Sequence, residues 1–200
     1  MLDGWIRPLI DPPLDRAAIR IRAWGVSADT MTAIGFTIGI AAMPAIATEH
    51  YGIGLLLVLV NRLFDGLDGA VARATSPTDR GAYLDIVFDF LFYSAVVFAF
   101  ALARPANTRA GAFLIFSFVG TGASFLAFAS IAAKRSLTTT ARGSKSIYYL
   151  GGLTEGTETI LAFIVFCLVP AGFPAEAYVF GALCWITTVS RIAFAVRTLQ

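Results

Sequence analysis

Six apolar segments, each about as long as a membrane-spanning helix, restrict this 200-residue chain to very few folds. They cover approximately residues 30–48, 51–73, 79–103, 109–133, 150–170 and 176–196. A helix needs about 20 mostly apolar residues to cross the hydrocarbon core of a bilayer. Hydrophobic residues make up 58% of the chain and charged residues only 14%, so little length remains for a soluble domain. We predict an all-α integral membrane protein, a six-transmembrane-helix bundle formed by residues 29–200.

The basic residues indicate how this bundle is oriented. Arginines and lysines precede the first segment, flank the turn between the second and third, fill the stretch between the fourth and fifth, and end the chain: Arg7, Arg16, Arg20, Arg22, Arg73, Arg80, Lys134, Arg135, Arg142, Lys145 and Arg197. The opposite side holds only Arg104 and Arg109. Because basic residues stay in the cytoplasm, we expect both termini to be cytoplasmic.

The N-terminal segment, residues 1–28, has a different character. It carries Asp3, Asp11 and Asp15 and the pair Pro12-Pro13, and it has no long apolar core, so we do not expect a signal peptide. The stretch "PLDRAAIRIRAW" combines spaced arginines with apolar residues. This pattern favours an amphipathic helix in the cytoplasmic interface, where anionic membrane lipids attract it.

Two pairs of aspartates interrupt the apolar segments. Asp65 and Asp68 lie in "NRLFDGLDGAVAR", and Asp85 and Asp89 lie in "GAYLDIVFDF". Residues three or four apart share one face of a helix, so each pair forms a stripe. An aspartate near the centre of a bilayer costs roughly 2.5–3.5 kcal/mol on insertion scales, so a compensating partner is needed.

A hairpin around residues 74–78 brings the two stripes to matching depths. At about 1.5 Å per residue, Asp68 lies roughly 8 Å below Arg73 and Asp85 roughly 8 Å below Arg80, with Asp65 and Asp89 about one turn deeper. Four carboxylates in one volume require cations, and Mg²⁺ or Mn²⁺ suits such oxygen ligands. Two ions about 3.5–4 Å apart are the expected occupancy, with a phosphate-bearing substrate beside them. The alternative is a set of intramembrane ion pairs with Arg62, Arg73 and Arg80.

Small residues around the aspartates favour close contacts. Gly66, Gly69 and Gly81 leave room for a ligand, and Arg73 is placed to pair with a phosphate oxygen. Gly35 and Gly39, four apart in the first segment, permit close approach of another helix.

Ser76 and Pro77 predict a helix start, with Ser76 as N-cap.

The run "DGLDGAVAR-x7-GAYLDIVFD" resembles the signature of the CDP-alcohol phosphatidyltransferases, D-x2-D-G-x2-A-R-x7or8-G-x3-D-x3-D. All eight fixed positions match: Asp65, Asp68, Gly69, Ala72, Arg73, Gly81, Asp85 and Asp89. The resemblance implies metal-dependent transfer of a phosphatidyl-type group from a CDP-alcohol, usually CDP-diacylglycerol, to an acceptor hydroxyl with release of CMP. It also implies phospholipid biosynthesis in a bacterial inner membrane, a cytoplasmic active site, a homodimer and no nucleic-acid partner.

The resemblance assigns roles to individual residues. Asp65, Asp68, Asp85 and Asp89 become metal ligands, with Asp89 also the general base. The CDP site is expected to include Gly66, Gly69, Ala72, Arg73 and Gly81. Many members also carry P-N-x-x-T at the start of the first span. Here the stretch is "ADTMT", which keeps Thr32 but has Ala28 and Asp29 in place of proline and asparagine. Asp29 and Thr32 are expected to contact the nucleotide, with Asp29 as an acceptor for the amino group of cytosine.

The sequence does not identify the acceptor substrate. A small alcohol or a polyol phosphate is expected, and Lys134, Lys145 and Arg191 are the candidate contacts for an anionic one. The lysines serve equally well as topology determinants. Glu155 and Glu158 either bind acceptor hydroxyls or cap the fifth helix.

The sequence is also compatible with two other functions. An intramembrane prenyltransferase also uses Mg²⁺ and aspartates on a diphosphate, and it releases pyrophosphate instead of CMP. A non-enzymatic Mg²⁺-binding membrane protein releases neither. The placement of all four aspartates near one membrane face argues against an ion conduit, which needs polar residues through the full thickness.

Overall fold

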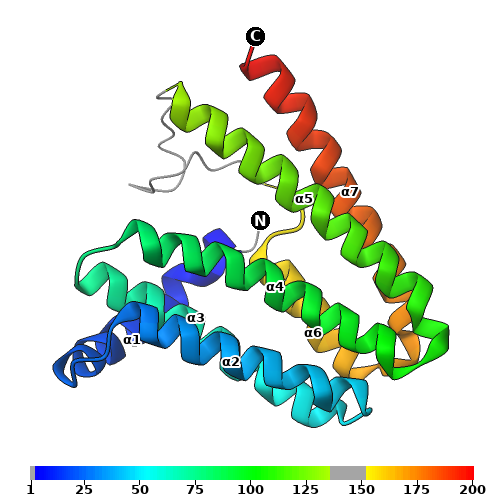
Figure 1. Ribbon diagram of the computed structural model, residues 1–200, viewed down its shortest axis with the longest axis horizontal. Coiled ribbons are helices and arrows are strands. Elements are labelled where there is room, and N and C mark those ends of the chain that lie inside the picture. Colours follow the sequence, from blue (N-terminus) through cyan, green and yellow to red (C-terminus); the bar gives the residue numbers. More distant parts are fainter. Residues whose placement is uncertain (1–2, 136–151) are drawn as a thin grey trace.

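A computed structural model describes residues 3–135 and 152–200, which form α-helices and two short 3₁₀ helices and contain no strand (Figure 1). The long helices are α1 Asp3–Ala23, α2 Ala28–Ala47, α3 Tyr51–Ala74, α4 Asp79–Ala103, α5 Thr108–Lys134, α6 Gly156–Leu168 and α7 Phe173–Thr198. The 3₁₀ helices are η1, Pro105–Asn107, before α5 and η2, Pro170–Gly172, before α7.

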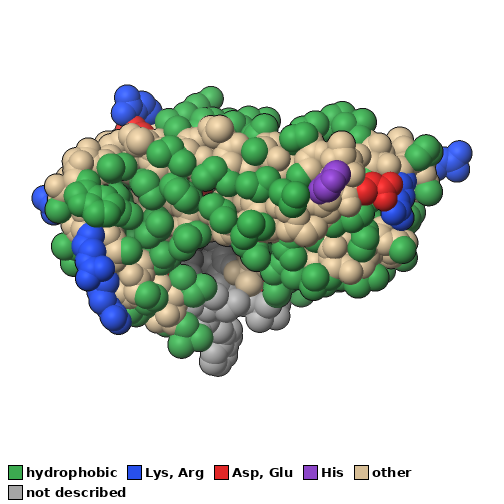
Figure 2. All heavy atoms as spheres, turned by 90° about the horizontal axis from the view of Figure 1, so that it is seen from below, with side chains coloured by type: hydrophobic (Ala, Val, Ile, Leu, Met, Phe, Trp, Pro, Cys, Tyr) green, Lys and Arg blue, Asp and Glu red, His purple; other side chains and the backbone are tan. Residues whose placement is uncertain are grey.

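Helices α2–α7 lie on the six predicted segments, and four of them are long and apolar enough to cross a membrane. These four are α2, α4, α5 with η1, and α7 with η2. Helix α6 has only 13 residues, and α3 carries the charged residues of the aspartate motif in its second half. Figure 2 shows a largely apolar surface with charged side chains gathered at the two ends of the molecule. The chain is therefore an all-α integral membrane protein.

Helix α2 packs against both α3 and α4 and so holds the two aspartate-bearing helices in register. Gly35 and Gly39 make this close packing possible. A Cβ atom on Gly39 would lie 2.7 Å from the Asn61 amide nitrogen on α3 and 2.7 Å from the Phe92 ring on α4. A Cβ atom on Gly35 would lie 2.7 Å from the Cβ of Phe64. The predicted role of the two glycines is confirmed, because neither site has room for a side chain.

Phenylalanines form the centre of the bundle. Phe92 and Phe100 of α4, Phe163 and Phe166 of α6, and Phe173 of α7 are fully buried in one cluster. Phe100 and Phe173 stack with ring centroids 4.7 Å apart. Each aromatic pair adds about 0.5–1.5 kcal/mol beyond the burial of its area, so this cluster fixes α4, α6 and α7 together. Helices α5 and α7 run side by side (Figure 1).

Helix α1 is longer than predicted and packs on the C-terminal half of α3. Its Ala18 is fully buried against Ala70 and Val71 of α3. Arg22 donates a hydrogen bond from Nη1 to the carbonyl oxygen of Ala74, 2.9 Å away, at the end of α3. The apolar face of α1 therefore contacts the bundle. Pro8, Pro12 and Pro13 lie inside the helix.

The predicted start of α4 is wrong by two residues. Thr78, not Ser76, is the N-cap, and its hydroxyl accepts a hydrogen bond from the backbone N–H of Gly81 at 3.0 Å. The connection between α3 and α4 consequently includes Pro77 as a non-helical residue. Asp79 then lies in the first turn, where a negative charge stabilises the helix.

At the far end of the bundle, an ion pair connects the α2–α3 turn to the end of α4. Arg104 donates from Nε to Oε1 of Glu49 at 3.1 Å, and its Nη2 pairs with the other carboxylate oxygen. This hydrogen bonding holds the pKa of Glu49 below its ordinary value. Glu49 is also the one described non-glycine residue with a positive φ, 64°, which lets the chain reverse between the two helices.

Candidate active site and metal centre

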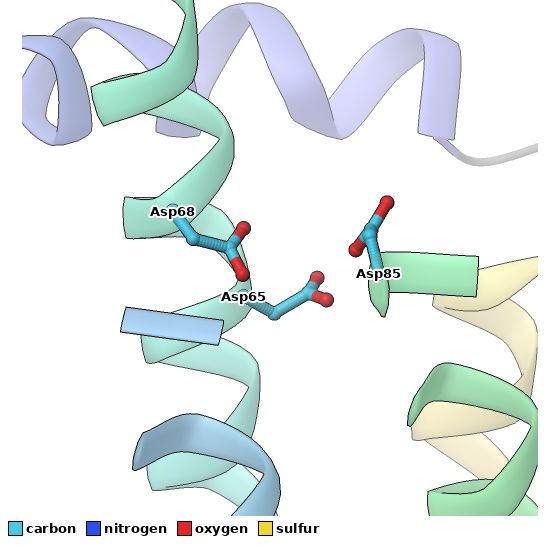
Figure 3. A group of neighbouring side chains, drawn as sticks. All are labelled: Asp65, Asp68 and Asp85. Carbon is cyan, nitrogen blue, oxygen red and sulfur yellow. The ribbon is translucent and has the colours of Figure 1, made fainter. Parts of the chain in front are cut away.

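Three of the four predicted metal ligands converge at the end of the bundle formed by the α3–α4 connection. Asp65 and Asp68 come from α3 and Asp85 from α4, and they point toward one another (Figure 3). One carboxylate oxygen from each lies within 4.8 Å of the others. Two features bring these side chains together. Asp65 and Asp68 are three residues apart and share one face of α3, and α4 runs back antiparallel to α3.

The donor set fits a hard divalent cation. Mg²⁺ binds oxygen at about 2.0–2.1 Å, so two of its ligands lie at most about 4.2 Å apart. Carboxylate oxygens within 4.8 Å of one another reach that spacing by small side-chain rotations. Asp68 is only 6% exposed, and a buried carboxylate needs a compensating positive charge. Asp65, Asp68 and Asp85 are therefore the residues that would hold the metal.

An open pocket contains this cluster. Its lining residues come from α2, α3 and α4: Thr32, Gly35, Phe36, Asn61, Arg62, Asp65, Asp68, Asp85, Phe88 and Asp89. Phe36 and Phe88 stack with centroids 4.1 Å apart across α2 and α4. The pocket thus combines acidic groups with an apolar wall.

Asp89 lies in the same pocket but has different partners. Its Oδ1 accepts a hydrogen bond from Nη2 of Arg62 at 2.9 Å, and its Oδ2 accepts one from the Tyr93 hydroxyl at 3.3 Å. Arg62 also donates from Nη1 to that hydroxyl at 3.3 Å. Arg62, Tyr93 and Asp89 therefore form a closed hydrogen-bonded ring, and Asp89 is not part of the three-carboxylate cluster.

Arg62 is the main site residue to which sequence reasoning gave no functional role. It entered only as an alternative ion-pair partner of the aspartates. Its side chain is 16% exposed, and Nη1 lies 3.6 Å from Oδ2 of Asp65. A signal was available in the sequence, because an arginine in an apolar segment three residues before Asp65 shares its helix face.

Comparison with known proteins identifies the family of this chain. Residues 26–194 match the sequence model of CDP-alcohol phosphatidyltransferases. The chain belongs to the CDP-alcohol phosphatidyltransferase family. It is an enzyme of phosphatidyl-group transfer, a membrane-bound transferase of phospholipid biosynthesis with a metal-binding site.

Individual relatives match this chain over nearly their full length. The chain is 50% identical over 201 residues to inner membrane protein YnjF of Escherichia coli (strain K12), covering 100% of this chain and 98% of the relative. It is 26% identical over 196 residues to archaetidylinositol phosphate synthase of Pyrococcus horikoshii, covering 98% and 97%.

Solved structures of Mycobacterium tuberculosis phosphatidylinositol phosphate synthase share the fold. The structure with CDP-DAG bound has a TM-score of 0.71 at 22% identity, covering 93% of both chains. The complex with manganese and citrate has a TM-score of 0.69 at 23% identity, covering 93% of this chain and 88% of that one.

The residues predicted for the nucleotide of a CDP-alcohol phosphatidyltransferase lie on α2, α3 and α4. Thr32 lines the pocket. A Cβ on Gly81 would lie 3.0 Å from Oδ1 of Asp29, and Asp29 is paired through Oδ2 with Nε of Arg80 at 2.8 Å. A Cβ on Gly66 would lie 2.7 Å from Leu14 of α1. The glycine at this position therefore accommodates Leu14 of α1.

Arg73, the predicted phosphate contact of this family motif, is engaged by α1. Its Nη2 lies 2.9 Å from Oδ1 of Asp15 and 3.8 Å from Oδ1 of Asp11. All three side chains are 41–54% exposed. Exposed pairs of this kind contribute about 0–1 kcal/mol, so Arg73 remains available to a phosphate. Ala72, the residue before it, is half-buried. Gly69 lies one turn earlier, and a Cβ atom on Gly69 would lie 3.5 Å from Nη1 of Arg73.

Two of the predicted acceptor contacts, Arg191 and Lys134, are not among the residues that line the carboxylate pocket. Arg191 of α7 is 8% exposed, and its Nη1 donates to the carbonyl oxygen of Thr121 on α5 at 3.1 Å. Lys134 is exposed in the last turn of α5, and Lys145 lies outside the described residues. Glu155 and Glu158 form a capping box at the start of α6, which confirms the capping role among the two alternatives.

Proposed function

We propose that this protein transfers a phosphatidyl group from CDP-diacylglycerol, or a similar CDP-alcohol, to the hydroxyl of a small polar acceptor and releases CMP. The observation that carries the proposal is the convergence of Asp65, Asp68 and Asp85 from two helices within 4.8 Å at one end of an apolar bundle. The mycobacterial structures with CDP-DAG and with manganese and citrate support the choice of donor and of a divalent ion.

The cluster residues would hold Mg²⁺ or Mn²⁺, and we expect two ions in the complete site. When bound, such ions neutralise the diphosphate and stabilise the leaving phosphate. Gly69 and Gly81 give the nucleotide access to the backbone. Arg73 exchanges its ion pair with Asp15 for a pair with a phosphate oxygen. The remaining contacts proposed for the nucleotide are Asp29, Thr32, Gly66 and Ala72.

The transfer step is a displacement at phosphorus. The acceptor oxygen forms a bond to the lipid-side phosphorus, and the bond from that phosphorus to the bridging oxygen breaks, so CMP leaves. The acceptor proton passes to a base, and we assign this role to Asp89, which lines the pocket below the cluster. Tyr93 and Arg62 fix the carboxylate of Asp89 in place through hydrogen bonds of 3.3 and 2.9 Å.

We propose a polyol phosphate as the acceptor, because a relative that is 26% identical and the solved structures that share the fold are inositol phosphate lipid synthases. Arg191 is the strongest candidate for its phosphate, since a buried guanidinium is suited to bidentate recognition of phosphate. Lys134 and Lys145 are the further candidates.

We further propose that α2–α7 all cross a bacterial inner membrane, in keeping with the name of the Escherichia coli relative. Helix α1, in the N-terminal segment 1–28, then lies at the cytoplasmic interface beside membrane lipids, with both termini and the active site on the same side. The catalytic domain comprises residues 29–200 and works as a homodimer.

The proposal is tested by the leaving nucleotide. Purified protein in detergent micelles is supplied with CDP-diacylglycerol, Mg²⁺ and a panel of acceptors: inositol phosphate, glycerol phosphate, inositol and serine. We expect CMP release with a phosphorylated polyol, no release in EDTA, and none from Asp68→Ala. Asp79→Ala is the matched control, because Asp79 is an exposed aspartate of α4 outside the pocket.

Other outcomes have clear meanings. Pyrophosphate release from a prenyl diphosphate would favour the prenyltransferase reading. Full activity in Asp68→Ala would contradict the metal assignment, and CMP release with serine alone would contradict the polyol phosphate.

A further inference from the structure

Helices α2 and α4 pack side by side along the pocket and keep one register over its length. They run in the same direction, because α3 returns the chain between them (Figure 1). At the end near the α3–α4 connection, a Cβ atom on Gly81 would lie 3.0 Å from Oδ1 of Asp29. About two turns further along each helix, the rings of Phe36 and Phe88 stack with centroids 4.1 Å apart. Matching positions of the two helices therefore face each other from one pair to the next.

The polarity of this α2–α4 seam changes from one end to the other. The outer end is charged, since Nε of Arg80 donates to Oδ2 of Asp29 at 2.8 Å. One turn further in, Asp85 brings its carboxylate to the metal-binding cluster. Another turn further in, Phe36 and Phe88 line the pocket, and they are the two apolar side chains among its described lining residues. A charged end, a carboxylate cluster and an apolar end thus follow one another within about 10 Å.

The apolar end of the pocket leads to the surface that faces the bilayer. Phe36 and Phe88 are each half-buried, so part of each ring remains uncovered. Leu91, the next residue along this side of α4, is 51% exposed, and α4 is long and apolar enough to cross a membrane. An alkyl chain joined to a group at the carboxylates can therefore reach the lipid along an apolar path.

This order of surfaces fits an amphiphile with a charged head, a diphosphate and alkyl chains. We propose that Phe36 and Phe88 form the subsite for the first methylene groups of the donor's acyl chains. The pair makes the protein select a lipid-linked CDP-alcohol over a water-soluble one. The inference rests on the proposed transfer from a CDP-alcohol and deepens it, because it chooses between the donors that this transfer leaves open.

The test compares two donors that differ only in their acyl chains. Full-length protein at a fixed concentration of detergent micelles, with Mg²⁺ and without acceptor, is titrated with CDP-glycerol and with CDP-dihexanoylglycerol in a calorimeter. Burying about two methylene groups changes affinity roughly tenfold, so we expect the acylated donor to bind at least about tenfold more tightly. Equal affinities for the two donors in the wild-type protein would overturn the inference.

Substitutions separate the proposed contact from simple packing of α2 against α4. In Phe36→Ala and Phe88→Ala we expect the preference for the acylated donor to fall to within about threefold, with the Kd of CDP-glycerol unchanged. Phe36→Leu keeps an apolar side chain and should retain most of the preference. Phe98→Ala is the matched control, because Phe98 lies on α4, is 45% exposed and does not line the pocket. Folded alanine variants that keep the wild-type preference, or that weaken both donors equally, would refute the proposal.

Photochemical crosslinking tests the same contact in the wild-type protein, should the alanine variants fail to fold. CDP-diacylglycerol with a diazirine near the ester of one acyl chain is bound with Mg²⁺ and irradiated, and the digested protein is examined by mass spectrometry. We expect adducts on Phe36, Phe88 or Leu91 that excess unlabelled CDP-diacylglycerol suppresses. Adducts confined to α5 or α7 would overturn the inference.

The outcomes also separate this subsite from the proposed transfer. CMP release with equal affinities for the two donors would refute the acyl-chain subsite and leave the transfer standing. A preference for the acylated donor without CMP release to any acceptor would refute the transfer and leave the subsite standing.

Discussion

Replacing Asp89 with asparagine tests whether its carboxylate is the base of the transfer. The ring around it should survive the change. The asparagine oxygen still accepts from Nη2 of Arg62, which is 2.9 Å from Oδ1 in the wild type. The new amide group faces the Tyr93 hydroxyl, which can accept from it by rotating its own proton. The Arg62–Asp89 ion pair becomes a hydrogen bond from a charged guanidinium to a neutral amide oxygen, so the folded state loses about 1–2 kcal/mol, and the protein should remain folded.

The effect on turnover should be much larger than the effect on stability. An amide cannot take up the proton of the acceptor hydroxyl, and a positioned base contributes about 10²–10⁴-fold in rate. The first metal site keeps Asp65, Asp68 and Asp85. We therefore expect CDP-diacylglycerol binding within about tenfold of wild type and kcat lower by at least about a hundredfold.

The assay compares a binding isotherm and CMP release on the same purified samples. Asp65→Asn is expected to weaken Mn²⁺ and nucleotide binding together with turnover, because Asp65 belongs to the cluster. Asp79→Asn, an exposed aspartate on the same helix as Asp89, should leave both unchanged. If Asp89→Asn loses nucleotide binding as severely as Asp65→Asn, Asp89 is chiefly a metal ligand. Near-normal turnover would show that no side-chain base is needed there.

Three further predictions address the bundle and its metal. In a cysteine-free variant, an impermeant thiol reagent outside intact cells should label a cysteine at Thr108, which is exposed, and spare one at Arg142. The reverse pattern would contradict a cytoplasmic location for the stretch between α5 and α6. Gly39→Ala should lower the melting temperature, because its Cβ would lie 2.7 Å from both α3 and α4 and overpacking costs about 1–3 kcal/mol. Gly52→Ala should leave the melting temperature unchanged, because no atom lies within 4 Å of the Cβ that it adds. Equal changes in melting temperature for the two variants would refute the packing argument. Saturating Mg²⁺ should raise the melting temperature of the wild type and not of Asp68→Ala, since a ligand bound only by the folded state stabilises it, and an equal rise in both would place the ion elsewhere.

The sequence was sufficient for the helices because hydrophobic runs and helix geometry are local properties. Helices α2–α7 fall on the six predicted segments, and Asp65 and Asp68 share a face because they are three residues apart. The local rule failed at the start of α4, where Ser76 and Thr78 both suit an N-cap. Only the backbone path, which places the Thr78 hydroxyl 3.0 Å from the N–H of Gly81, decides between them.

The extent of α1 also exceeded what the sequence indicated. Prolines at three positions favour a break in a helix, yet the helix continues from Asp3 to Ala23. Its buried contact is supplied by α3, through Ala18 against Ala70 and Val71. A pattern that suits a lipid surface also suits the apolar side of another helix, so sequence alone does not separate the two.

The acidic motif shows the boundary between sequence and tertiary structure most clearly. Spacing determined that four aspartates lie near one end of two antiparallel helices, and the family signature gave the chemistry. The division of those aspartates into a cluster of three and a separate Asp89 depends on Arg62, Tyr93 and the insertion of α2 between α3 and α4. Hydrogen bonds such as the 2.9 Å contact from Arg62 to Asp89 join residues 27 positions apart. Such contacts depend on how the helices rotate and pack in three dimensions, and no local pattern in the chain encodes that rotation.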